Sequence, residues 1–158
     1  MSIGDICNRE VVFVNRDVTV HAVCRLMRHY HVGTLVVADE VEGKRVPVGI
    51  LTDRDIVVEV NAMDLDAKVM TAGDIMSPEL VTVQESLGIA DSIEVMRVRG
   101  IRRLPIVDKE NCLVGIVAID DLLVALAGEL SGIAHVVSRE YMRERHVRKE
   151  LGPDVQAL

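Results

Sequence analysis

Aromatic side chains are almost absent from this 158-residue chain, which contains one Phe, two Tyr and no Trp. Proteins that bind single-stranded nucleic acids stack bases on aromatic side chains, so the usual platform for that contact is missing. A basic excess is lacking too, because the formal net charge is −7 and phosphate backbones are bound by positively charged faces. We therefore expect no nucleic-acid partner.

Cysteine is also scarce. Cys7, Cys24 and Cys112 are far apart and odd in number, and none forms a Cys-x-x-Cys pair, so we expect neither a disulfide framework nor a metal site. The chain shows no basic N-terminal segment followed by an apolar run, and no run approaching the roughly 18 apolar residues that span a bilayer. These absences predict a soluble, cytoplasmic protein with no membrane partner.

What the chain does contain is an internal repeat. Gly4-Asp5-Ile6 returns 69 positions later as Gly73-Asp74-Ile75. After a shift of three residues the match resumes, with Val48-Gly49-Ile50 over Val114-Gly115-Ile116, so the extra residues are predicted to lie in the turn Glu42–Arg45. Tandem repeats bury their open faces against each other, and two related repeats can enclose a cleft with two equivalent sites.

Hydrophobic periodicity predicts the same elements in both repeats. In the first repeat a short strand at Val11–Val14 precedes a helix, two paired strands and a second helix that begins at Asp53. The second repeat follows the same β-α-β-β-α order. Pro105 lies inside one of its strands, and because Pro has no N–H to donate, that strand is predicted to lie at a sheet edge or to stop pairing there.

The residues after the second repeat have no counterpart after the first. Gly128 and Gly132 are predicted to weaken a single long helix, and a charged helical pattern resumes from Ser138 until Gly152-Pro153. Acidic residues interrupt the basic ones, so the pattern favours a dimer arm or a partner-docking helix over a nucleic-acid or membrane contact.

The sharpest local feature is the junction Gly49–Asp55, where a predicted strand runs directly into a helix. Thr52 and Asp55 fit a capping box, in which the hydroxyl accepts a hydrogen bond from the first turn and the carboxylate supports the helix end. The same geometry suits a ligand, because a helix N-terminus attracts phosphate and a nearby carboxylate can accept both hydroxyls of a ribose. The residues alone leave both roles open.

Two β-α-β-β-α repeats with such a junction resemble a tandem pair of CBS domains, also called a Bateman module, over residues 3–130. Gly100–Asp108, with the sequence Gly-Ile-Arg-Arg-Leu-Pro-Ile-Val-Asp, is similar to the second-strand motif of that family. The resemblance implies an α+β fold of two CBS repeats, 3–66 and 72–130, packed as a pseudo-two-fold pair, with a C-terminal helical tail over 131–158.

The resemblance also implies a function. It indicates a regulatory module, not an enzyme, that binds an adenine nucleotide or related adenosyl ligand in the cleft between the repeats and uses no catalytic cofactor. AMP, ADP, ATP, NAD and S-adenosylmethionine are the expected ligands, and the expected partners are a second copy in a homodimer and an effector protein on which the module acts in trans. The alternative is a constitutive homodimeric scaffold with no ligand.

Two sites are carried over from the family pattern, in which the Asp of Thr-x-x-Asp holds the ribose and an Arg pair faces phosphate. The first comprises Thr52, Arg54, Asp55, Gly33, Thr34, Met76, Ser77 and Pro78. The second comprises Asp121, Asp120, Arg102, Arg103, Ile6, Cys7 and Asn8. The first site is favoured for a nucleotide, because the second site has Ala118 at the position where Thr52 supplies a hydroxyl in the first.

Overall fold

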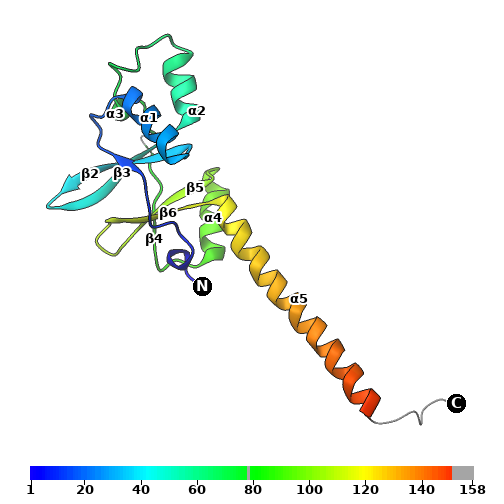
Figure 1. The fold of residues 1–158 in the computed structure, drawn as a ribbon. Coiled ribbons are helices and arrows are strands. Elements are labelled where there is room, and N and C mark those ends of the chain that lie inside the picture. Colours follow the sequence, from blue (N-terminus) through cyan, green and yellow to red (C-terminus); the bar gives the residue numbers. More distant parts are fainter. Residues whose placement is uncertain (78, 151–158) are drawn as a thin grey trace. The chain divides into compact units, whose positions relative to one another are not determined.

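The computed structural model describes residues 1–77 and 79–150, which belong to two compact units, Met1–Ile119 and a second that begins at Asp120 (Figure 1). The first repeat consists of η1 (Ile3–Asp5), β1 (Phe13–Val14), α1 (Val20–Tyr30), β2 (Thr34–Val41), β3 (Lys44–Thr52), α2 (Asp53–Asp55) and the π-helix η2 (Ile56–Asn61). The second consists of α3 (Ala72–Ile75), β4 (Val83–Gln84), α4 (Ile89–Arg99), β5 (Arg103–Val107), β6 (Leu113–Ala118) and the start of α5 (Ile119–Glu150).

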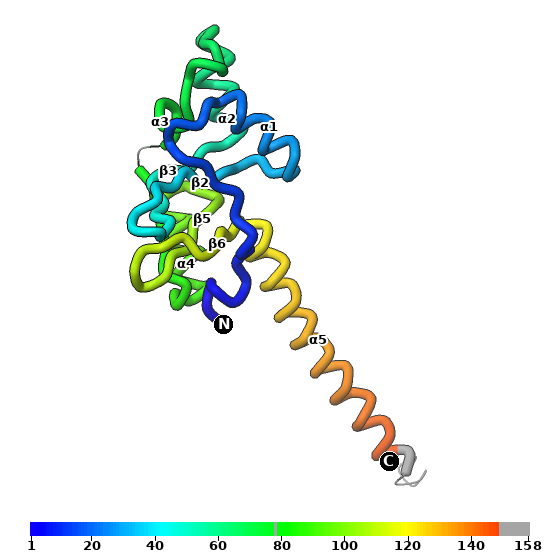
Figure 2. The backbone as a smooth tube through the Cα atoms, turned by 60° about the vertical axis from the view of Figure 1, so that its left-hand side comes forward, coloured from blue at the N-terminus to red at the C-terminus, as the bar shows by residue number. Residues whose placement is uncertain are grey.

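Each repeat forms its own three-stranded sheet, in the order β1-β2-β3 and β4-β5-β6. In both sheets the first pair of strands is parallel and the second pair is an antiparallel hairpin. The predicted repeat of β-α-β-β-α is therefore confirmed. Both hairpins point to the same side of the first compact unit, and an ion pair between Lys44 and Glu110 joins their turns (Figure 2).

The hairpin of the first repeat carries the extra residues. Its turn places Glu42 and Gly43 at φ 51° and 76°, the two consecutive left-handed conformations of a type I′ turn. Pairing extends from Thr34 opposite Thr52 to Val41 opposite Lys44, so both strands are longer than their apolar runs predicted. The predicted turn at Glu42–Arg45 thus contains the connection, and its last two residues belong to β3.

Helix α1 shows how local sequence sets the ends of an element. The Thr19 hydroxyl accepts a hydrogen bond from the Ala22 N–H at 3.3 Å and caps the first turn. Val23 and Met27, which are four residues apart, turn one face into the core of the first repeat. The helix ends at His31, which takes a left-handed conformation with φ 54°.

Pro105 lies in β5, the central strand of its sheet, so the predicted edge position is wrong. The alternative expectation holds, because pairing between β4 and β5 begins only at Ile106, one residue later. In the first repeat the equivalent residue, Val36, donates its N–H to the carbonyl of Val12 at 3.1 Å. Pro105 has no N–H and cannot make the same bond to Val81.

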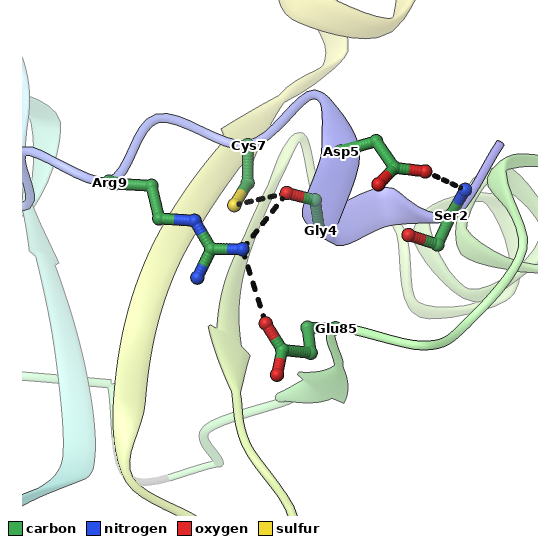
Figure 3. Close-up of polar contacts among 6 residues, drawn as sticks. All are labelled: Ser2, Gly4, Asp5, Cys7, Arg9 and Glu85. Carbon is green, nitrogen blue, oxygen red and sulfur yellow. Dashed lines mark hydrogen bonds and ion pairs between the residues drawn. The ribbon is translucent and has the colours of Figure 1, made fainter.

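The first residues of each repeat are attached to the other repeat. Gly4 donates its N–H to the carbonyl of Glu85 at 2.9 Å, and in the same way Gly73 donates to the carbonyl of Arg16 at 2.8 Å. Figure 3 shows a further contact beside the first of these bonds, where the Arg9 guanidinium donates to the Gly4 carbonyl at 3.2 Å and to the Glu85 carboxylate at 3.1 Å. The two repeats therefore exchange their N-terminal segments and fold as one body.

Helix α5 is continuous through Gly128 and Gly132, where the sequence predicted a weakening (Figure 1). By length and composition alone, its span Ile119–Arg148 is able to cross a membrane, which qualifies the expectation that no such run exists. Helices of proteins that never enter a membrane pass the same test, so this finding by itself assigns no location. The predicted end of the helix at Gly152-Pro153 lies outside the described residues.

Replacing Gly128 and Gly132 with Ala is expected to stabilise α5 by about 0.5–1 kcal/mol for each substitution, because Gly loses more backbone entropy in a helix than Ala does. A Cβ at either position meets no atom within 4 Å, so no steric cost opposes the gain. Thermal unfolding followed by ellipticity at 222 nm measures the change. Gly43→Ala is the control that should destabilise, because Gly43 has a φ of 76°.

Candidate ligand-binding site

A pocket of about 160 Å³ lies between residues of the two repeats. Its walls come from the end of β3, from the segment before β4, and from the segment that leads into β5. The lining residues are Ile50, Thr52, Ser77, Glu79, Leu80, Val81, Ile101, Arg102, Arg103 and Pro105. Apolar residues, two arginines and one glutamate thus line one space, and this combination suits a ligand with an apolar ring and an anionic group.

The segment before β4 is held against the first repeat by its backbone. The Ser77 N–H donates to the carbonyl of Ile50 at 3.1 Å, and the Met76 side chain packs over Gly49. A Cβ at Gly49 would lie only 2.3 Å from the sulfur of Met76, so glycine is required for this approach. Met76 and Ser77 therefore lie beside the end of β3, where the sequence analysis placed them, whereas Pro78 lies outside the described residues.

Thr52 and Asp55 form the predicted capping box. The Thr52 N–H and hydroxyl donate to Asp55 Oδ2 at 2.8 and 2.7 Å, and the Asp55 N–H donates to the Thr52 hydroxyl oxygen at 3.2 Å. The cap positions the Thr52 hydroxyl at the pocket wall. Asp55 itself is half-buried and Arg54 is exposed, and neither is among the lining residues.

The same cap occurs twice more, at Ser2 with Asp5 and at Thr71 with Asp74. Hydrogen bonds from the backbone and side chain of the capping residue lower the pKa of both Asp5 and Asp74. Neither of these pairs lines the pocket. A Thr-x-x-Asp sequence in this chain is thus a helix cap first, and only Thr52 among these three capping residues also borders the pocket.

The arginine pair lies on the pocket that Thr52 borders, although the sequence analysis grouped it with Asp121. The backbone of Arg103 does pair with Ala118 in the second sheet, as the repeat alignment implied. Arg103 nevertheless lines the pocket together with Arg102, Thr52 and Ser77. Neighbouring backbones in a sheet therefore do not identify which residues share a site, because side chains leave the sheet on two opposite faces.

Gly33 and Thr34 show the same effect in the first repeat. Thr34 pairs with Thr52 across β2 and β3, and the Gly33 carbonyl accepts a hydrogen bond from Asp53 at 3.1 Å. Neither residue lines the pocket. The Thr34 hydroxyl is buried and has no hydrogen-bond partner among the described residues.

Comparison with known sequences decides the family. The family model described as the CBS domain matches residues 3–62 and 72–128, once for each repeat. The chain belongs to the CBS domain family. It is 36% identical to the CBS domain-containing protein YhcV of Bacillus subtilis over 134 residues, which cover 84% of this chain and 91% of that protein.

Longer CBS proteins match as well. The protein MK0525 of Methanopyrus kandleri is 35% identical over 78% of this chain, but the chain spans only 61% of the length of MK0525. Likewise, the hexameric CBS-CP12 protein from bloom-forming cyanobacteria has a TM-score of 0.69 at 29% identity over 78% of this chain, which spans 66% of that protein. The activities and partners of such longer proteins do not pass to this chain by likeness alone.

Two solved CBS structures add information on ligands of those proteins. Hypoxic Response Protein I, with a TM-score of 0.70, 30% identity and coverage of 79% of this chain and 98% of that one, was solved with two coordinated zinc ions. The CBS domain pair of MJ0100, with a TM-score of 0.69 and 21% identity over 80% of this chain and 99% of that one, was solved in complex with 5′-methylthioadenosine and S-adenosyl-L-methionine. At that identity, the likeness to MJ0100 shows the fold alone.

The second CBS site is only partly assembled in the first compact unit. Asn8 exchanges two backbone hydrogen bonds with Ile116, at 2.8 and 2.9 Å, and Cys7 packs over Gly115 as Met76 packs over Gly49. Ile6 lies one residue before this crossing segment. Asp120 and Asp121 lie in the first turn of α5, in the second compact unit.

A second pocket, of about 380 Å³, borders the segment that contains Asn8. Its lining residues are Asn8, Glu10, Val11, Val12, Phe13, Leu26, Tyr30 and Val32. The first four are the repeat equivalents of Ser77, Glu79, Leu80 and Val81 in the first pocket. None of the described residues that line this second pocket is basic, although the Arg45 guanidinium lies 4.3 Å from the ring centroid of the lining residue Phe13.

Several lining residues of the first pocket escaped the sequence analysis. They are Ile50, Glu79, Leu80, Val81, Ile101 and Pro105. The signal was present, because these residues flank Thr52, Ser77 and the arginine pair in the sequence. The sequence did not show on which face of the sheet each of these side chains lies.

Proposed function

We propose that this CBS pair is a regulatory module that binds an adenosyl ligand with an anionic group in the pocket between β3 and β5. The observation that carries the proposal is the convergence of Thr52, Ser77 and the arginine pair on one pocket with apolar walls. A constitutive scaffold has no use for two guanidinium groups that face such a pocket. The complexes of MJ0100 support the adenosyl class as a proposal for this chain.

The apolar walls suit the base. Ile50, Val81 and Pro105 offer aliphatic surface on which a planar heterocycle can pack. Because Pro105 lacks the N–H that its equivalent Val36 donates to Val12, the carbonyl of Val81 is not occupied by residue 105. In this proposal that carbonyl accepts a hydrogen bond from the exocyclic amino group of adenine.

The polar residues suit the rest of the ligand. Arg102 and Arg103 provide charge-assisted hydrogen bonds to a phosphate or carboxylate group. Thr52 and Ser77 line the same pocket, and in this proposal their hydroxyls contact the sugar. Asp55 is not among the lining residues, so the proposal requires the sugar to reach past the lining to Asp55 Oδ1, the carboxylate oxygen that the cap does not use.

Binding without turnover is proposed, with the ligand favouring one arrangement of a homodimer that a partner protein recognises in trans. Such coupling requires that the ligand binds the two arrangements with different affinity. Thermal unfolding with AMP, ATP, NAD, S-adenosylmethionine and adenosine tests the proposal, because a ligand that binds only the folded state raises the melting temperature. No shift with any of the five would leave the constitutive scaffold as the function.

Asp55→Asn is expected to reduce affinity for adenosyl ligands by at least ~10-fold, because an amide accepts ribose hydroxyls more weakly than a carboxylate does. Asp74→Asn is the matched control, since Asp74 makes the same cap with Thr71 away from the pocket. Titration calorimetry measures both variants. Equal affinities for Asp55→Asn and Asp74→Asn would show that Asp55 is a cap only.

A further inference from the structure

Helix α5 presents an exposed apolar seam that begins in the second CBS repeat and continues beyond it. Its residues are spaced by alternating steps of three and four, and each is 39% to 68% exposed. They are Leu123, Leu126, Leu130, Ile133 and Val137. Because a helix has 3.6 residues per turn, this spacing places all five side chains in one narrow stripe along the helix.

The positions beside the stripe favour a second helix. Ala127 and Ala134 flank it on one side with small, uncharged side chains, which allow another helix backbone to approach closely. The same register continues with Glu140 and Glu144, so the apolar part ends at Val137. The seam is therefore about two heptads long.

The helix also needs a partner for its own stability. It is 32 residues long, roughly 48 Å at 1.5 Å per residue, and contains two glycines. Helices gain most of their stability in proteins from packing of an apolar face. An exposed stripe of five aliphatic side chains is therefore an unpaired contact surface.

A lipid bilayer fits the seam less well than a second helix does. Glu129 lies in the middle of the apolar stretch, and a carboxylate is costly at the centre of a bilayer. The opposite side of the helix carries Ser131, His135 and Ser138, all exposed. That side also carries Val124, which is 75% exposed, so the separation of polar and aliphatic sides that is typical of a helix pairing in water holds from Ser131 to Ser138.

We propose that the seam of α5 binds the same seam of a second copy of this chain and so contributes a two-stranded coiled coil to self-association. The occupant is a second copy because the stripe contains only aliphatic side chains, so an identical stripe is complementary to it without any matching charge. Burying the five side chains of each copy removes on the order of 1,000 Å² in total, at the lower end of specific interfaces. The coiled coil is accordingly a reversible contact that depends on protein concentration.

Sedimentation equilibrium of the full chain tests the proposal. Ile133→Glu places a charge in the seam, and Met142→Glu is the matched control, because Met142 lies off the seam and is 65% exposed against 63% for Ile133. Ile133→Glu should raise the dissociation constant of the dimer by at least ~100-fold, since it buries an unpaired charge, whereas Met142→Glu should change it less than about threefold. Circular dichroism of both variants verifies that the fold is retained.

A second variant tests the seam by gain instead of loss. Replacing Glu140 and Glu144 with Leu extends the apolar stripe by one heptad and should tighten the dimer by at least ~10-fold. The proposal is overturned if the unaltered chain is monomeric at ~100 μM, if Ile133→Glu and Met142→Glu give the same dissociation constant, or if the double leucine variant does not tighten it.

Flotation with vesicles of phosphatidylcholine and phosphatidylglycerol tests whether the seam binds a lipid bilayer instead of a second helix. Vesicle binding that Ile133→Glu abolishes, without any change in self-association, would assign the seam to lipid and overturn the proposal. None of these readouts uses the pocket, so failure of the coiled coil leaves the proposed ligand binding untouched, and the reverse also holds.

Discussion

Simultaneous replacement of Arg102 and Arg103 with Ala is expected to weaken binding of AMP or ATP by at least ~100-fold while leaving adenosine affinity within about threefold, because only the phosphate loses its charge-assisted hydrogen bonds. The expectation follows from the position of both guanidinium groups in the lining of the first pocket. Titration calorimetry with the nucleotide and the nucleoside in parallel separates the contribution of the phosphate from that of the base and sugar.

Arg99→Ala is the matched control for this experiment. Arg99 carries the same charge three residues before the pair, at the exposed end of α4, and does not line the pocket. An equal loss of AMP affinity in Arg99→Ala would indicate a general effect of net charge. Unchanged AMP affinity in the double variant would remove the arginines from the proposed site.

The largest expected effect on stability comes from Gly4→Ala, which should lower the free energy of unfolding by about 1–3 kcal/mol. A Cβ at Gly4 would lie 2.8 Å from both the carbonyl oxygen and the Cβ of Glu85, and the backbone oxygen cannot move without breaking the contact between the repeats. At the equivalent Gly73, the nearest atom is the carbonyl oxygen of Arg16 at 3.1 Å. Gly73→Ala should therefore cost less than about 1 kcal/mol.

Urea unfolding of the two variants side by side measures the difference. Both substitutions also restrict the unfolded chain equally, so the comparison isolates the contact in the folded state. Equal stabilities would show that the Gly4 segment shifts away from Glu85 at no cost. In that case the exchange of N-terminal segments contributes little to holding the two repeats together.

The repeat and its helices and strands could be predicted from the sequence because they depend on local signals. A 69-residue offset, a period of two or 3.6 in the apolar residues, and a Thr-x-x-Asp cap are all properties of short stretches of sequence. The cap at Thr52 and the crossing of Met76 over β3 lie where they were predicted. The edge position predicted for Pro105 was wrong, because β5 pairs with both β4 and β6 and that order depends on contacts outside the strand itself.

The set of residues that line the candidate site was predicted less well from the sequence. The alignment of repeats placed Thr34 and Arg103 at equivalent positions, and each was assigned to the site of its own sheet partner. In the structure Arg103 lines the same pocket as Thr52, and Thr34 does not. Alignment reports which backbones are equivalent, whereas a pocket depends on which side chains face each other.

The sequence alone determined the duplication, the α+β architecture, the helix caps and the kind of ligand worth testing. The caps rest on contacts between neighbours in the chain, and the others rest on the repeat or on the resemblance to a family. The exchange of N-terminal segments, the grouping of the arginines with Thr52 and the unbroken α5 were decided by the folded chain. The exchange of N-terminal segments and the grouping of the arginines with Thr52 depend on packing between residues far apart in the sequence, and such packing is fixed only when both repeats bury their surfaces together.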